Sequence, residues 1–194
     1  MARPVVGLLL AAGSATRFGG DKLQAKLPDG RPLAVATLAA LAPAVDSVVA
    51  VVRPGASALQ SLLERSGAAV VVCAGADAGM GASLACGVRA IEARHPNADG
   101  AIIALADMPW ISPATVREIA AALRRGAALA APSYAGRRGH PVAISARFFG
   151  ELKALSGDEG AKSLLAAHAD EIELIAVDDP GVLRDVDTPG DLRG

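Results

Sequence analysis

The sequence contains few aromatic residues, few cysteines and no long hydrophobic run. Phe, Trp and Tyr make up 3% of its 194 residues and the formal net charge is −1, so neither a stacking platform nor a broad basic face for nucleic acid is expected. No apolar stretch approaches the roughly 20 residues that a membrane-spanning helix needs. Cys73 and Cys86 do not form a CxxC pair, which predicts core thiols rather than a disulfide framework or a zinc site. We therefore expect a soluble, cytoplasmic protein that binds neither nucleic acid nor membranes.

The N-terminal residues allow two interpretations. Residues 1–3 followed by VVGLLLAAGSA resemble a secretory signal, with a positive start, a short apolar core and a small-residue cleavage site. However, the start holds a single Arg, Pro4 follows it at once, and the apolar core is at the lower limit of length for a signal. The same run is typical of a buried first strand, and we expect it to be one.

Short Val/Ile/Leu runs alternate with helical patterns along the chain. Most runs are continuously apolar, as in strands that are covered on both faces. The expected strands are Val5–Leu10, Ser47–Val52, Ala69–Cys73, Ala101–Leu105, Leu129–Ala131, Pro141–Ser145, Ile172–Val177 and Leu183–Val186. The expected helices are Leu33–Leu41, Leu59–Arg65, Ser83–Arg94, Pro113–Arg124, Arg147–Leu155 and Glu159–His168. This pattern predicts one domain over residues 1–194, a three-layer, Rossmann-like α/β fold with a mainly parallel sheet, helices on both faces and an antiparallel member in the second half.

A loop of small residues follows the first predicted strand. Ligands of such sheets bind beyond the carboxyl ends of the strands, and AAGSATRFGGDK occupies that place. The loop is neither a dinucleotide fingerprint nor a Walker A motif. Its small residues let backbone amides approach an anion, and Arg17 and Lys22 can neutralise phosphate charge. The pattern favours phosphate binding, and the alternative is a surface loop with incidental cations.

An acidic residue follows the predicted strand Ala101–Leu105. Asp107 comes just past this strand, at the same sheet edge as the small-residue loop, where a carboxylate can hold a divalent cation. The alternative is that Asp107 caps the next helix. Ser112, directly before Pro113, suits that position better, and we therefore favour the metal.

Two more acids lie near the end of the chain. Asp185 and Asp187 are two residues apart on an extended segment and therefore point the same way. One of them can complete a magnesium site. In the alternative interpretation, Asp187 or Thr188 caps the last short turn.

Six segments, in order along nearly the whole chain, resemble the molybdenum cofactor cytidylyltransferases. They are LAAGSATRFGGDK at 10–22, GMGASLACG at 79–87, LADMP at 105–109, GRRGHP at 136–141, SGDEGAKSLL at 156–165 and DDPGVLRDVDTPGDL at 178–192. These MobA-like nucleotidyltransferases have the nucleotide-diphospho-sugar transferase fold. The resemblance implies an enzyme that moves CMP from CTP to the terminal phosphate of molybdopterin and releases pyrophosphate. It also implies Mg²⁺, with Mn²⁺ as the alternative ion.

The resemblance also implies roles for single residues. Arg17 and Lys22 match the cations on the triphosphate, and together with Asp107 they are the expected catalytic residues. Asp187 matches a second metal-binding acid, with Asp185 as the other candidate. The residues that match nucleotide-binding segments are Leu10, Ala11, Ala12, Gly13, Gly79, Met80, Gly81 and Ser83. The sequence LAAG is the form found in relatives that use CTP, whereas relatives that use GTP have LAGG. For Gly79–Ser83 the alternative without the resemblance is a tight turn in which Ser83 caps a helix.

Two segments remain for the acceptor. The resemblance assigns to acceptor binding Arg137, Arg138 and His140 of GRRGHP at 136–141, and Asp158 of SGDEGAKSLL at 156–165. Without the resemblance, Arg137 and Arg138 are interpreted as solvated charges of a turn, and His140 as a histidine whose ring nitrogens have hydrogen-bond partners. A maturation chaperone of a molybdoenzyme is a further partner that the resemblance implies.

Two other functions are compatible with parts of the pattern. The first is a nucleotidyltransferase that uses GTP or another acceptor, such as a sugar phosphate or methylerythritol phosphate. The second is a non-catalytic α/β binding module, which is disfavoured because a receiver-like site needs acids where this chain has Ala11-Ala12-Gly13. A phosphate acceptor is largely dianionic at pH 7, which explains why the sequence shows no Ser-His-Asp or Cys-His arrangement.

Overall fold

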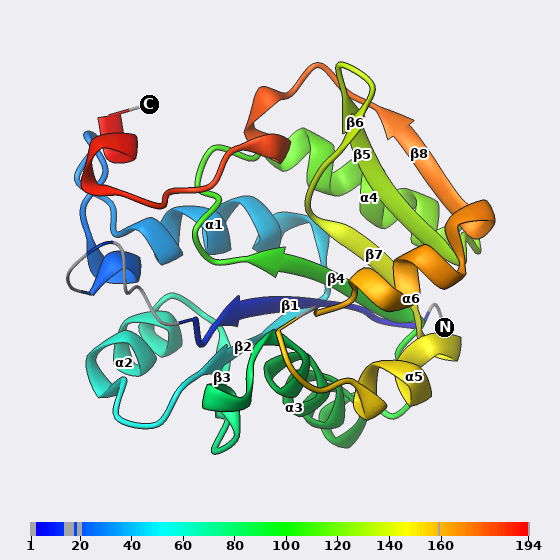
Figure 1. The fold of residues 1–194 in the computed structure, drawn as a ribbon, viewed down its shortest axis with the longest axis horizontal. Coiled ribbons are helices and arrows are strands. Elements are labelled where there is room, and N and C mark those ends of the chain that lie inside the picture. The colour runs from blue at the N-terminus through cyan, green and yellow to red at the C-terminus, as the bar shows by residue number, and fades with distance from the viewer. Residues whose placement is uncertain (1–2, 14–17, 19–20, 159, 194) are drawn as a thin grey trace.

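The computed structural model describes residues 3–13, 18, 21–158 and 160–193 and contains an eight-stranded sheet with helices on both faces (Figure 1). The strands are β1 (Val5–Ala11), β2 (Ser47–Val52), β3 (Ala69–Val72), β4 (Gly100–Leu105), β5 (Leu129–Tyr134), β6 (Arg137–Arg138), β7 (Val142–Ser145) and β8 (Ile172–Ala176). The helices are α1 (Leu33–Leu41), α2 (Ser57–Arg65), α3 (Met80–Arg94), α4 (Pro113–Arg124), α5 (Phe149–Ala154) and α6 (Lys162–Ala167). The predicted three-layer α/β fold is confirmed.

The strands β1, β2 and β4 are parallel and form the centre of the sheet. The strand order is β3-β2-β1-β4-β7-β5-β6, and β8 pairs with β5. Ala11 at the end of β1 lies opposite Val52 at the end of β2, and Leu10 lies opposite Leu105 at the end of β4. The three strands therefore end at one edge of the sheet, and the loops that follow them come together there.

The expected antiparallel member of the second half is β7. It runs antiparallel to β4 on one side and to β5 on the other, with Ile144 opposite both Ala101 and Leu129. The short strand β6 is also antiparallel to β5. The sheet is thus mixed: β3, β2, β1 and β4 are parallel to one another, and beyond β7 the strand β8 pairs parallel with β5.

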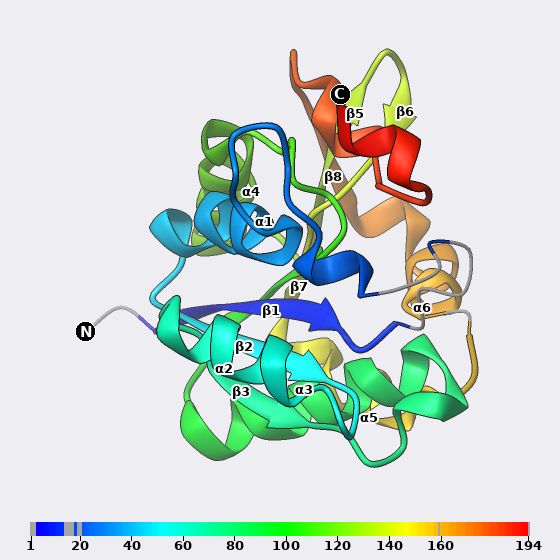
Figure 2. The same cartoon turned by 90° about the vertical axis from the view of Figure 1, so that its left-hand side faces the viewer.

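Two hydrophobic clusters fill the space on the two faces of the sheet. Figure 2 shows α1 and α4 on one side of β1 and α3 and α5 on the other. All seven residues of β1 are buried, as expected for a strand that is covered on both faces. Cys73 is buried and Cys86 half-buried, and both are free thiols. Burial, with a contribution from the Cys73 thiol, raises the pKa of Cys86 to about 11. No helix in the described ranges is long and apolar enough to cross a membrane.

The prediction of a strand at Leu183–Val186 is wrong. Residues Pro180–Leu183 form a short 3-10 helix instead, because Pro180 has no N–H for a sheet and the Asp179 side chain accepts a hydrogen bond from Gly181 N at 3.0 Å. The chain then runs beside the loop after β4, where Val186 N donates to Asp107 O at 2.9 Å. The tail is therefore attached to the sheet edge without being part of the sheet.

Asp179 connects this tail to the start of α4. The buried carboxylate accepts hydrogen bonds from Ser112 N at 2.9 Å and from Thr115 Oγ1 at 2.7 Å. Ser112 itself caps α4, as predicted, by accepting a hydrogen bond from Ala114 N at 3.2 Å. One carboxylate thus satisfies donors from both segments.

We expect Asp179→Ala to lower the free energy of unfolding by about 3 kcal/mol, because it leaves buried donors without an acceptor. Urea unfolding followed by circular dichroism measures this loss. Asp178→Ala, at the exposed neighbouring position, is the matched control and should change stability by less than about 0.5 kcal/mol. Equal stability of the two variants would show that Asp179 does not hold the tail.

Candidate active site

A cavity of about 420 Å³ lies beyond the ends of β1 and β4. Its lining includes most of the residues predicted from the sequence: Leu10, Ala12, Gly13, Lys22, Gly79, Met80, Ser83, Asp107, Asp158 and Asp187. Residues 10–13 and Asp107 reach it because the parallel register aligns the ends of their strands. Segments far apart in the sequence are thus gathered around one space.

Lys22 joins two carboxylates in the wall of this cavity. It begins the short 3-10 turn Lys22–Gln24, and its side chain is 11% exposed. Its ammonium nitrogen lies 2.9 Å from Asp107 Oδ2 and 3.6 Å from Asp187 Oδ1. A single cation therefore contacts one carboxylate from the loop after β4 and one from the C-terminal tail. Arg17, the other predicted cation, lies outside the described residues.

The main chain around Asp107 is fixed from three directions. Ala106 N donates to Leu10 O at 3.0 Å, and Ala106 O accepts from the buried Thr37 Oγ1 at 3.0 Å. Asp107 O accepts from Val186 N at 2.9 Å. These bonds hold the Asp107 carboxylate at the sheet edge, and they also place the tail beside it. Because Ser112 caps α4, Asp107 is not needed as a cap.

The tail brings Asp187, and not Asp185, to Lys22. The two acids flank Val186, which is fully buried. Lys22 forms its tail contact with Asp187, whereas Asp185 interacts with His140. Asp191, inside the last turn Pro189–Arg193, folds its carboxylate back to accept hydrogen bonds from Asp187 N at 3.1 Å and from Thr188 N at 2.7 Å. Thr188 directly precedes this turn, and its carbonyl oxygen accepts a hydrogen bond from Asp191 N at 3.1 Å; the alternative that Asp187 or Thr188 caps the turn stays a prediction.

Helix α3 begins at Met80, earlier than expected, and its first turn faces the same cavity. Gly79 is the N-cap residue with φ +109°, so Ser83 lies inside the helix and does not cap it. Gly81 N donates to Gly157 O at 2.8 Å. This contact packs the segment that contains Asp158 against the start of α3. Asp158, predicted for the acceptor, therefore lies beside the predicted nucleotide-binding residues.

The GRRGHP turn is attached to the tail that carries Asp187, because His140 N donates a hydrogen bond to Val182 O at 2.9 Å. Arg137 and Arg138 form β6 and are exposed, whereas His140 is largely buried and its Nδ1 has no hydrogen-bond partner in the described ranges. Burial lowers the pKa of His140, with smaller effects from Asp107 and Asp185, which raise it, and from Arg138, which lowers it. The alternative of a satisfied histidine is therefore wrong for Nδ1.

Asp77 lines the cavity although the sequence analysis did not single it out. It lies in the 3-10 turn Ala76–Ala78, which follows β3. A single acid in a loop of Ala and Gly has no periodic pattern that marks it. The pairing of β3 with β2 brings its loop to the sheet edge, and only the assembled sheet reveals it.

A mixed sheet that gathers small residues, a lysine and carboxylates at the ends of its parallel strands is characteristic of nucleotidyltransferases. Comparison with known proteins supports this class, because the model of the MobA-like NTP transferase domain matches residues 7–172. The match covers most of the chain. The chain therefore belongs to the MobA-like NTP transferase family and is a nucleotidyltransferase.

Individual relatives are similar over nearly their whole lengths. The purine catabolism protein PucB of Bacillus subtilis is 31% identical over 193 residues, which cover 95% of this chain and 92% of PucB. The crystal structure of Rv0371c from Mycobacterium tuberculosis has a TM-score of 0.83 at 33% identity, covering 96% of this chain and 95% of the other. A complex of Rv0371c with manganese has a TM-score of 0.77 at 32% identity, covering 97% and 95% of the two chains.

We expect Gly79→Ala to destabilise the start of α3. The left-handed φ strains any residue with a Cβ, and the added atom would clash with Asp158 Oδ1 and Gly157 O. The free energy of unfolding should fall by about 1–3 kcal/mol, measured by urea unfolding. Gly75→Ala is the control, since its φ is −92° and a Cβ there meets no atom within 4 Å. A loss as large in the control would show that the strain at Gly79 is not the cause.

Proposed function

We propose that this nucleotidyltransferase moves CMP from CTP to the terminal phosphate of a molybdopterin-type acceptor and releases pyrophosphate, with Mg²⁺ or Mn²⁺ at Asp107 and Asp187. The observation that carries the proposal is the contact of Lys22 with both carboxylates in the cavity lined by Gly13. CTP is favoured by the sequence LAAG at residues 10–13, which resembles cytidylyl rather than guanylyl relatives.

The donor set fits a hard divalent cation. Asp107 and Asp187 both lie within 4.0 Å of the Lys22 ammonium nitrogen, so one cation between them can contact both. No set of three or more His, Cys, Asp or Glu side chains in the described part of the chain is arranged around a metal position. Proteins usually hold Mg²⁺ with one or two carboxylates, and phosphate oxygens of the substrate and water molecules supply the other ligands. The manganese complex of Rv0371c supports the same class of ion.

The nucleotide fits the space between the β1 loop and α3. Gly13 lines the cavity without a side chain, which lets a phosphate approach the main chain. The first turn of α3 presents the positive end of a 15-residue helix, and this end favours an anion. Lys22 can then shift from its two carboxylates toward the triphosphate. Arg17 is the second cation in this proposal.

The acceptor is assigned to the side of the site where the GRRGHP turn lies. His140 interacts electrostatically with Asp107, so an acceptor held by this turn is near the proposed reaction centre. Arg138 is exposed on β6 and supplies a positive charge for an anionic acceptor. Asp158 stands beside α3, which makes a role at the nucleotide an alternative to its predicted role at the acceptor.

The reaction needs alignment more than proton transfer. A terminal phosphate oxygen of the acceptor attacks the α-phosphorus of CTP, a new P–O bond forms, and the bond to the β-phosphate breaks with pyrophosphate leaving. Since the attacking phosphate is largely dianionic at pH 7, no general base is required. A divalent cation, when bound, offsets the repulsion between the phosphates. Lys22 stabilises the charge that develops on the leaving pyrophosphate.

The proposal is tested by pyrophosphate release with CTP and with GTP, each with and without molybdenum-loaded cofactor. CTP should exceed GTP by at least roughly tenfold in kcat/KM, a difference of about 1.4 kcal/mol, and release should require the acceptor. Equal use of CTP and GTP would contradict the assignment of the nucleotide. Release with a sugar phosphate or methylerythritol phosphate, and none with the molybdenum cofactor, would contradict the assignment of the acceptor.

We expect Asp107→Asn to lower turnover by about a hundredfold or more, because it removes one of the two carboxylates proposed to hold the cation. Binding of Mn²⁺, followed by electron paramagnetic resonance, should weaken in parallel. Asp170→Asn, at an exposed position with no side-chain hydrogen bond in the described ranges, is the control and should bind Mn²⁺ normally. Normal turnover and normal Mn²⁺ affinity in a folded Asp107→Asn protein would remove Asp107 from the metal site.

A further inference from the structure

The two cysteines of the chain flank the segment that forms one wall of the candidate site, and the proposed function uses neither thiol. Cys73 directly follows β3 and is buried, whereas Cys86 lies on α3 and is half-buried. Both pack in the hydrophobic cluster on the α3 side of the sheet. They are the only cysteines of the sequence, so a disulfide within one chain can form between these two alone.

The main chain of α3 places the two thiols next to each other. The Cys73 thiol donates a hydrogen bond to Ala82 O, with the sulfur 3.7 Å from the oxygen. Cys86 is four residues after Ala82, so its side chain lies on the same face of the helix and leans back over this turn. The two sulfurs are therefore neighbours. Burial, followed by the hydrogen bond between the two thiols, raises the pKa of Cys86, in agreement with this geometry.

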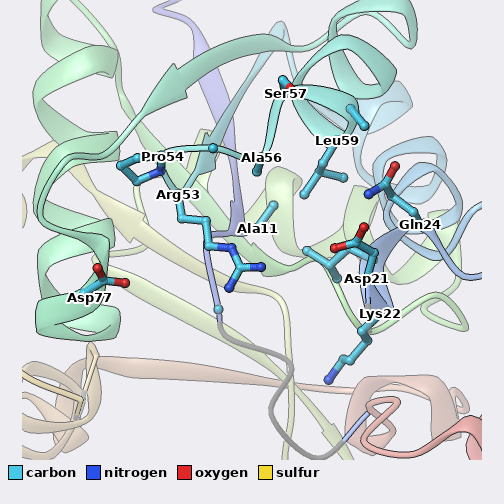
Figure 3. A pocket seen from close by; sticks show the side chains of 14 residues that line it. Ala11, Asp21, Lys22, Gln24, Arg53, Pro54, Ala56, Ser57, Leu59 and Asp77 are labelled. Atoms are coloured by element: carbon cyan, nitrogen blue, oxygen red, sulfur yellow. The ribbon is translucent and has the colours of Figure 1, made fainter. Parts of the chain in front are cut away.

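Residues 74–85, between the two thiols, form a wall that two cavities share. The residues of this segment that line the cavity of the candidate site are Ala76, Asp77, Gly79, Met80 and Ser83. Asp77 also lines a second cavity, again of about 420 Å³, which adjoins the first on the side of β2 and into which Arg53 projects (Figure 3). Gly13 lines both cavities as well. A change in the position of the segment therefore changes the shape of both spaces.

The position of this wall depends on close main-chain contacts at both of its ends. Cys73 N donates to Val52 O at 2.8 Å, which holds the start of the segment at the sheet. At the helix end, Gly81 packs so closely on the segment after α5 that an added Cβ would lie 2.8 Å from main-chain atoms of Ser156. A shift of the first turns of α3 relative to β3 therefore disturbs this contact and the cavity wall together.

We propose that Cys73 and Cys86 form a reversible disulfide, and that this bond weakens nucleotide binding at the candidate site. Two sulfurs in van der Waals contact must approach by more than about 1 Å to form an S–S bond of about 2.05 Å, which draws the second turn of α3 toward the end of β3. The first turn of α3, which lines the cavity, moves with it. This inference rests on the proposed function, because CTP is the nucleotide whose binding is affected.

A low-molecular-weight disulfide, such as glutathione disulfide, is the oxidant. The Cys86 thiolate, which is the more accessible, attacks one sulfur of the oxidant, and a first glutathione leaves as its thiolate. The Cys73 thiolate then attacks the Cys86 sulfur, the protein disulfide forms and the second glutathione leaves. The protons of the two protein thiols end on the two glutathiones, and two electrons pass from the protein to the oxidant. An excess of reducing thiol reverses both steps.

Incubation with glutathione disulfide at about pH 8.5 tests the chemistry, since the thiolate fraction of Cys86 is then about thirtyfold larger than at pH 7. Mass spectrometry of the non-reduced protein should show the loss of both thiol hydrogens and a peptide that links residues 73 and 86. Cys86→Ser is the matched control, because it removes the accessible thiol and should leave the buried one unreacted. Absence of the linked peptide, or a glutathione adduct that does not resolve, would overturn the inference and leave the proposed function intact.

Titration calorimetry with CTP and Mg²⁺ then tests the effect on binding. The oxidised wild-type protein should bind CTP about tenfold more weakly than the reduced protein, and dithiothreitol should restore the affinity. Cys86→Ser should bind CTP as the reduced wild type does, before and after the same treatment. Equal affinity of the oxidised and reduced wild type would overturn the inference, and so would a similar loss in treated Cys86→Ser, because it would indicate a reaction elsewhere. Failure of the reduced wild type to bind any nucleotide would overturn the proposed function as well.

Discussion

The parallel register of β1 with its two neighbours determines where the site lies. Because Ala11 ends opposite Val52 and Leu10 opposite Leu105, the three strands deliver their outgoing loops to one edge of the sheet. The loop after β1 contributes small residues, the loop after β2 contributes the cation Arg53, and the loop after β4 contributes the carboxylate Asp107. The same alignment connects the two cavities at Gly13. A shift of the pairing register of one strand by one residue would separate these groups and turn the buried side chains of that strand to the other face of the sheet.

The second constraint is electrostatic. Asp107 and Asp187 carry like charges, and Lys22 lies close enough to both to offset their repulsion. The tail that carries Asp187 is not a strand, so its position depends on the hydrogen bond from Val186 N to Asp107 O and on the buried Asp179. The stability of the tail and the composition of the candidate site are therefore linked. This link explains why residues near the end of the chain belong to a site formed mainly by its first half.

The sequence predicted the helices Leu33–Leu41 and Pro113–Arg124 to the residue, because caps and prolines mark their ends. It misplaced the start of α3, where Gly79 serves as N-cap with a left-handed φ and no sequence pattern distinguished it from a turn. It also predicted a strand at Leu183–Val186. Leu183 ends a 3-10 turn and Val186 is buried where the tail contacts the loop after β4, and two apolar residues in a four-residue segment do not distinguish these from a strand.

The sequence by itself determined the fold class, the loop of small residues after β1 and the candidacy of Lys22 and Asp107, because these depend on local patterns and on the ends of buried strands. Tertiary structure alone decided that Asp187 rather than Asp185 contacts Lys22, that Asp158 packs against the start of α3, and that Arg53 and Asp77 line one cavity. Each of these outcomes joins segments that are distant in the sequence. The physical reason is that strand pairing and tail docking set such distances, and neither leaves a periodic signal in the residues that it brings together.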